Sequence, residues 1–188
     1  MPFHPQKSER YLCALRNFLH RKIVKNGNMP QYVKMLKKIY LCEAVFYNSD
    51  FYCGCDLYRL TDYLFGAAVL RFLLEGKELS STLSGNGEFL VNFRLYEIAV
   101  CELLSFAQSG STVRFSATDR GVVLALSKAS QKPILTAARH LGARLFRLLP
   151  NGDFALFLPL LRGRGEYKIK YETEYLYDRY SVLNVFLD

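Results

Sequence analysis

Between residues 56 and 160 the sequence alternates one helix pattern with two strand patterns, and this order strongly constrains the fold. In the helix patterns, apolar residues recur every three or four positions, whereas in the strand patterns they alternate or form short runs. Packing helices of this kind against strands buries the apolar faces of both. We therefore predict an α+β fold in which helices cover one face of a mixed sheet.

The boundaries of these elements follow from capping and turn residues. Asp56 is a good N-cap for a helix that ends at Glu75-Gly76. We predict further helices over residues 94–108 and 133–141, the second closed by Gly142. Strands are predicted around three turn signals, Gly85-Asn86-Gly87, Asp119-Arg120-Gly121 and Pro150-Asn151-Gly152, and cover residues 78–84, 88–91, 112–117, 122–127, 144–148 and 154–158.

The first 55 residues have the pattern of a helical hairpin. Amphipathic helices are predicted over residues 8–24 and from Pro30 to Val45, separated by Asn26-Gly27-Asn28. Two helices this short cannot bury their apolar stripes alone. We expect them to pair with a second copy as a four-helix bundle, so that residues 1–55 form a dimerisation domain and the chain is a homodimer.

The last residues, 161–188, are predicted to form a β-rich extension. Tyrosine and other residues alternate from Tyr167 to Tyr175, and residues 182–187 are a second apolar run, which together suggest a terminal hairpin or edge strands. Cross-strand packing accounts for the tyrosine row.

Composition excludes several classes of protein. A chain of 188 residues with 51% hydrophobic residues is neither disordered nor too short for a core, and no window is apolar enough to span a membrane. Charged residues interrupt the amino terminus, which argues against a secretory signal. Five cysteines without a C-x-x-C pair lack the spacing of disulfide frameworks or zinc sites, so we expect a reduced, cytoplasmic protein. Cys53-Gly54-Cys55 could chelate a soft metal, but two packed thiols are the simpler interpretation.

The formal charge of +8 suggests an anionic partner, either an acidic protein surface or nucleic acid. Basic residues are densest in the first third of the chain. A sequence pI near 9.3 and the row of Tyr and Lys residues from 166 to 177 leave a small nucleic-acid-binding protein as one alternative, ranked below protein binding because the basic clusters are sparse.

The usual catalytic signatures are absent from the sequence: there is no P-loop, no G-x-G-x-x-G, no G-x-S-x-G and no H-E-x-x-H. His20 has cationic neighbours in the sequence and is expected on the polar side of its helix. His140 precedes a helix end, where an interaction with the helix dipole is the ordinary role.

Several short strings, in order, resemble two-component sensor histidine kinases, in which dimerisation helices precede an ATP-binding domain shared with gyrase and heat-shock ATPases. Residues 55–60 (CDLYRL) resemble the linker into the ATP-binding domain, and residues 102–107 (ELLSFA) resemble its N-L-L-x-N-A helix. Residues 138–145 and 152–160 resemble the final helix, glycine and two strands that end in Leu-Pro. The resemblance spans about residues 10 to 160 and implies an ATPase-like sandwich at 56–160.

The chain departs from this family where the family binds nucleotide and phosphoryl groups. Phe106 replaces the second Asn, which helps to hold Mg²⁺, and phenylalanine offers a hard cation no oxygen. Residues 127–133 (SKASQKP) replace the D-x-G-x-G string that reads adenine. Residues 13–19 (CALRNFL) follow the family's H-E-L-R-N-P-L string with Cys13 in place of the phospho-accepting His, and this thiol is expected to be packed and inert.

These departures predict a degenerate, non-catalytic member of the family that binds neither ATP nor a metal. We expect it to act in two-component signalling by dimerisation and by binding a response regulator or an active sensor kinase on Arg16, Arg21, Lys22 and Lys25. An alternative is a histidine phosphotransferase of the same architecture, with His20 as the phosphoryl acceptor.

Overall fold

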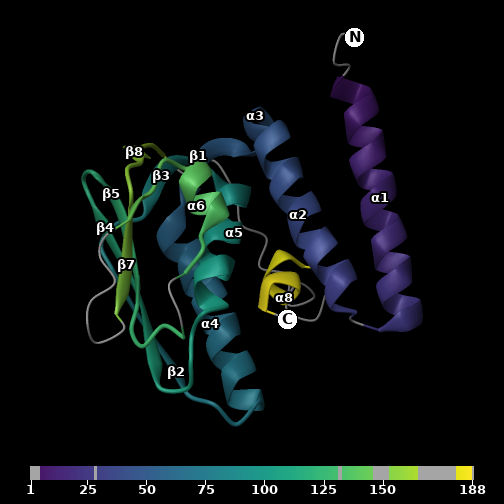
Figure 1. Cartoon of the computed structure of the whole chain (residues 1–188). Coiled ribbons are helices and arrows are strands. Elements are labelled where there is room, and N and C mark those ends of the chain that lie inside the picture. The colour runs from purple at the N-terminus through teal and green to yellow at the C-terminus, as the bar shows by residue number, and fades with distance from the viewer. Residues whose placement is uncertain (1–4, 28, 131–132, 146–152, 165–180, 188) are drawn as a thin grey trace.

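The computed structural model describes residues 5–27, 29–130, 133–145, 153–164 and 181–187. Helix α1 (Pro5–Asn26) and helix α2 (Pro30–Phe46) lie side by side and form the predicted hairpin, with Pro30 in the first turn of α2. α1 is the outermost element, and α2 lies between it and the rest of the chain (Figure 1). Among the described helices, none is long and apolar enough to cross a membrane.

A five-stranded sheet forms the other side of the molecule. Its strand order is β2-β4-β5-β7-β6, with β2 (Leu79–Ser84) parallel to β4 (Ser111–Thr118) and every other pair antiparallel. The remaining strands are β5 (Gly121–Leu126), β6 (Arg144–Leu145) and β7 (Phe154–Leu158). The sheet is mixed, as predicted, and β4 and β5 form the hairpin expected around residues 119–121.

A second, three-stranded sheet lies where the hairpin joins the sandwich. The short helix α3 (Asn48–Phe51) leads into β1 (Tyr52–Asp56), which pairs antiparallel with β3 (Glu88–Asn92), and β3 pairs with β8 (Leu161–Arg162). A strand at 52–56 was not predicted, because that segment was interpreted as a break between domains. The partner of β1 is β3, which lies far away in the sequence, so no local pattern indicates this pairing.

Three helices cover one face of the five-stranded sheet: α4 (Leu57–Leu74), α5 (Phe93–Leu104) and α6 (Thr136–His140) (Figure 1). Asp56 caps α4 as predicted, because its side chain accepts a hydrogen bond from the backbone N–H of Arg59. At the other end Gly76 has φ of +69°, and Lys77 N–H bonds back to the Phe72 carbonyl in the Schellman arrangement. The alternating residues of β4, β5 and β7 face these helices and form one core with them.

Two sequence predictions about the strands are wrong. The strands on either side of Gly85-Asn86-Gly87 do not pair with each other: β2 pairs with β4, and β3 pairs with β1. Residues 182–187 are not a strand but a helix, α8 (Val182–Leu187), which packs on α2 and α5. The tyrosine row at 166–177 lies outside the described residues, so its predicted strand stays a prediction, as do the boundaries at 55 and 160.

Candidate functional site

The segment that follows β5 packs directly on the end of α5, where the sequence resemblance places a nucleotide. Backbone N–H of Ser130 donates a hydrogen bond to the Phe106 carbonyl at 3.0 Å. The Phe106 ring and Ala129 are both partly buried against the core. Phe106 therefore contributes to packing at this point, in line with its lack of a metal-binding oxygen.

Glu102 lies on α5 near the same segment and links α5 to α6. Its carboxylate accepts a hydrogen bond from the Ala137 backbone N–H at 3.0 Å, which ties α5 to the first turn of α6. Burial raises the pKa of this carboxyl to about 7, although the backbone N–H groups of Ala137 and Thr136 and the Arg139 charge act to lower it. Sequence reasoning missed this role, and the available signal was a carboxylate on a mostly apolar helix whose other charged residues, Arg94 and Glu97, pair with each other.

The helical hairpin is held together by a buried apolar line and one ion pair. Leu19 and Ile23 of α1 are buried, and α2 is the helix against which α1 packs. Arg16 donates from Nη1 to both carboxylate oxygens of Glu43 on α2, each at 3.0 Å. Burial raises the pKa of Glu43, and Arg16 opposes that rise. Arg16 is therefore engaged within the hairpin.

An apolar stripe on α1 remains open to solvent. Tyr11, Leu15 and Phe18 follow one another at spacings of four and three, so they share one side of the helix, and they are 76%, 40% and 51% exposed. Successive residues of an α-helix are rotated by about 100° about its axis. By this rotation the stripe lies about a quarter-turn around α1 from Leu19 and Ile23, which face α2.

A matching stripe lies on α2. Met35 and Phe46 are 44% and 61% exposed, and half-buried Cys42 shares their side of the helix by helical spacing. Because the two helices run in opposite directions, this spacing places both stripes on the same side of the hairpin. We call Tyr11, Leu15, Phe18, Met35 and Phe46 the hairpin face. Single exposed apolar residues are normal, whereas five large ones on one side of a hairpin make that side a candidate interaction surface.

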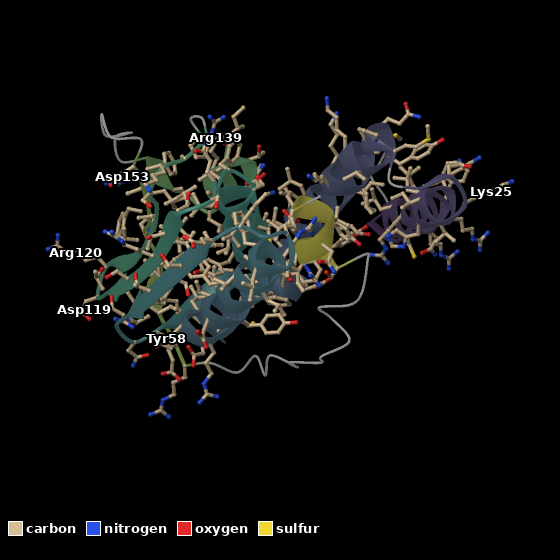
Figure 2. All side chains as sticks on the ribbon, turned by 90° about the horizontal axis from the view of Figure 1, so that it is seen from below. Lys25, Tyr58, Asp119, Arg120, Arg139 and Asp153 are labelled. Atoms are coloured by element: carbon tan, nitrogen blue, oxygen red, sulfur yellow. The ribbon has the colours of Figure 1, made fainter. Side chains whose placement is uncertain are left out.

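The other residues predicted to bind a partner lie around the hairpin face. Arg21 and Lys25 are exposed on α1 beyond the apolar stripe, and Lys22 Nζ lies 5.4 Å from the centre of the Phe18 ring. Figure 2 shows Lys25 at the end of the molecule opposite to Asp119 and Arg120. The four predicted basic residues thus divide into three that border the open face and Arg16, which is paired across the hairpin.

The predicted histidine and cysteine sites have ordinary packing environments. His20 is half-buried, not solvated as predicted, and its Nε2 lies 3.5 Å from the Tyr40 hydroxyl oxygen on the other side of the hairpin from the hairpin face. Cys13 is half-buried, with Arg16 and Asn17 donating weakly to its sulfur at 3.8 Å. His140 is the exposed last residue of α6.

The paired thiols of residues 53–55 lie in strand β1. Cys55 is fully buried, and burial raises the pKa of its thiol to about 12, so it stays protonated. Within the part of the chain that the structure describes, no three His, Cys, Asp or Glu side chains gather as a metal site. The segment at 166–177, proposed for nucleic acid, lies outside that part.

No family model matches the chain, and no curated protein matches it. Its structure is similar to that of a mycobacterial sensor histidine kinase, MprB, with a TM-score of 0.42 and 12% identity over 60% of this chain and 99% of that chain. It is also similar to the histidine kinase AdeS of Acinetobacter baumannii, with a TM-score of 0.44 and 8% identity over 84% of this chain and 98% of that chain.

Proposed function

We propose that this protein is a non-catalytic, histidine-kinase-like scaffold that acts in two-component signalling through protein contacts. The hairpin face carries this proposal. Two stripes on antiparallel helices present large apolar side chains on one side, and a second copy of the same surface is self-complementary about a two-fold axis. Four helices packed in this way would bury residues that two helices leave exposed.

Loss of nucleotide chemistry is the second part of the proposal. Phe106 offers no metal ligand, and the contacts of Ser130 and Glu102 draw the segment after β5 onto α5. These contacts support a filled pocket where the resemblance would place ATP. Calorimetric titration with Mg-ATP is expected to give no heat of binding, and micromolar affinity would overturn this part alone.

Arg21, Lys22 and Lys25 are proposed to dock an acidic partner, a response regulator or an active kinase. We assign Arg16 to the stability of the hairpin because Glu43 occupies its guanidinium. Attraction of this kind weakens with salt. Binding of a purified receiver domain should therefore fall between low and moderate salt and on Arg21→Glu with Lys25→Glu, whereas Arg120→Glu on the β4–β5 turn should leave it unchanged.

Self-association is tested by light scattering on charge substitutions. Phe18→Glu with Phe46→Glu should convert a dimer to a monomer, because carboxylates would have to be buried at the interface. Leu73→Glu is the matched control, since Leu73 is 68% exposed on α4, away from the hairpin. Circular dichroism verifies that each variant is folded. A monomeric wild-type chain, or a dimer that survives both substitutions, would contradict the proposal.

A further inference from the structure

Helix α5 has almost no solvent-facing side. Nine of its twelve residues are buried. Among its charged residues, Glu97 pairs with Arg94 at 2.6 Å, and Glu102 bonds to the α6 backbone. A helix that is apolar all round needs cover on every side. That cover comes from α4, α6, α2 and the carboxyl-terminal helix α8, all of which contact α5.

Helix α8 is shared between the sandwich and the hairpin. Four of its six residues are buried, Val182, Leu183, Val185 and Phe186, and it contacts both α5 and α2. Lys37 on α2 donates a hydrogen bond to the Phe186 carbonyl at 3.3 Å, and its Nζ lies 5.6 Å from the centre of the Phe186 ring. Figure 1 shows α8 beside α2.

A separate contact joins the hairpin to the sandwich at the end of α2. Asn92, at the start of α5, donates from Nδ2 to the Ala44 carbonyl at 2.8 Å. Ala44 lies seven residues after Lys37, about 10 Å further along the helix at 1.5 Å per residue. α2 is therefore attached to the sandwich through α8 and through Asn92, in addition to its direct contact with α5. Attachments at two separated positions along α2 fix the direction of the helix, whereas loss of one of them leaves it freer to rotate about the other.

We propose that α8 is a releasable clasp that sets the orientation of the hairpin on the sandwich. A helix of six residues has negligible stability in isolation, so α8 forms only while it is seated between α2 and α5. When it is unseated, the hairpin keeps the Asn92 hydrogen bond and the direct α2–α5 contact, and it pivots about this remaining attachment. This coupling lies within one chain and goes beyond the proposed function. In a dimer, the clasp would also set the angle between the hairpin face and the sandwich, and this consequence alone rests on the proposed function.

Hydrogen exchange measured by mass spectrometry tests the clasp in the full chain, at a concentration where the wild-type protein is monomeric. Leu183→Ala with Phe186→Ala should make the amides of residues 182–187 and of α2 exchange on the order of tenfold faster, while β4 and β5 keep their rates. Leu187→Ala, at a partly buried position on the same helix, should have little effect. Small-angle scattering should show a longer maximum dimension for the double variant.

Two results would overturn the clasp. Equal acceleration in β4 and β5 would make α8 an ordinary part of a single core, and unchanged exchange in α2 would show that α8 does not hold the hairpin. Lys37→Met removes the hydrogen bond to Phe186 without altering α8 or α5, so it decides the matter if the double variant fails to fold. It should accelerate exchange in α2 and α8 by a smaller factor, again sparing the sheet. None of these readouts depends on self-association.

Discussion

Asn92 joins the start of α5 to the end of α2, because its Nδ2 donates a hydrogen bond to the Ala44 carbonyl oxygen at 2.8 Å. The same nitrogen donates to Asn48 Oδ1 at 2.8 Å, and Oδ1 of Asn92 accepts the Leu95 backbone N–H at 2.9 Å. The residue is 1% exposed. One buried amide thus serves both as a helix N-cap and as a tether for the hairpin.

Replacement of this amide separates its two roles. Asn92→Asp keeps an oxygen to cap α5 but faces the Ala44 and Asn48 oxygens with a buried carboxylate that has no proton to donate. We expect it to lower the free energy of unfolding by about 2–4 kcal/mol. Asn92→Ser keeps the cap without the buried charge and should cost about 1–2 kcal/mol. Urea unfolding measures both, and wild-type stability of Asn92→Ser, which keeps the cap and loses only the Nδ2 donor, would refute the tether.

Glu102 predicts a specific pH dependence. Its folded-state pKa of about 7 lies above the ordinary value of 4.5. Between pH 4.5 and pH 7, Glu102 is therefore protonated in the folded protein and ionised in the unfolded chain. Stability should therefore fall as pH rises from about 4.5 to 7 and should level off above that range. At 1.4 kcal/mol per pKa unit, this carboxyl contributes a loss of at most about 3.5 kcal/mol.

Glu102→Gln isolates that contribution, because a Gln oxygen can still accept the Ala137 N–H without titrating. The variant should gain stability relative to the wild type as pH rises from 5 to 8. Other buried carboxyls with raised pKa, such as Glu97, stay in both proteins and cancel in the comparison. Parallel stability curves for the two proteins across this range would disprove the assignment.

The Arg16–Glu43 pair is expected to stabilise the hairpin mainly by neutralising a half-buried carboxylate. Arg16→Met should raise the Glu43 pKa further and reduce stability by about 1–2 kcal/mol at neutral pH. Arg16→Met with Glu43→Met removes both charges and should recover most of that loss. A double variant less stable than the single one, in thermal or urea unfolding, would contradict this explanation.

Alanine substitutions at two glycines are expected to change the stability in opposite directions. Gly121 has φ of +137°, and an added Cβ would collide with the Leu158 carbonyl oxygen, so Gly121→Ala should cost more than about 2 kcal/mol by separating β5 from β7. Gly66 lies inside α4 with open space around its Cβ position. Gly66→Ala should therefore raise stability by up to about 1 kcal/mol, as judged by the melting temperature.

The candidate sites were only partly predictable from the sequence. Leu12, Leu15, Leu19 and Ile23 show helical spacing in the sequence, and the expectation of a covering partner followed from it. Which apolar residues face α2 and which stay open depended on the crossing of two helices. Arg16 has the same charge as Arg21 and Lys25, yet only the packed hairpin brings it to Glu43. The hydrogen bonds of Asn92 with Ala44 and of Glu102 with Ala137 join residues that are 48 and 35 positions apart in the sequence, so no local pattern predicts them.

Local chemistry determined the elements whose signals lie within a few residues. Asp56 as a helix cap, Gly76 as a helix end and the turn at Gly121 acted as their sequence context predicts, because capping and turn formation involve near neighbours. Tertiary structure decided the strand pairing around residues 85–87 and the helical state of Val182–Leu187. Strand pairing depends on which distant edges meet. A six-residue apolar run has no clear period, so its packing against α2 and α5 decided its conformation.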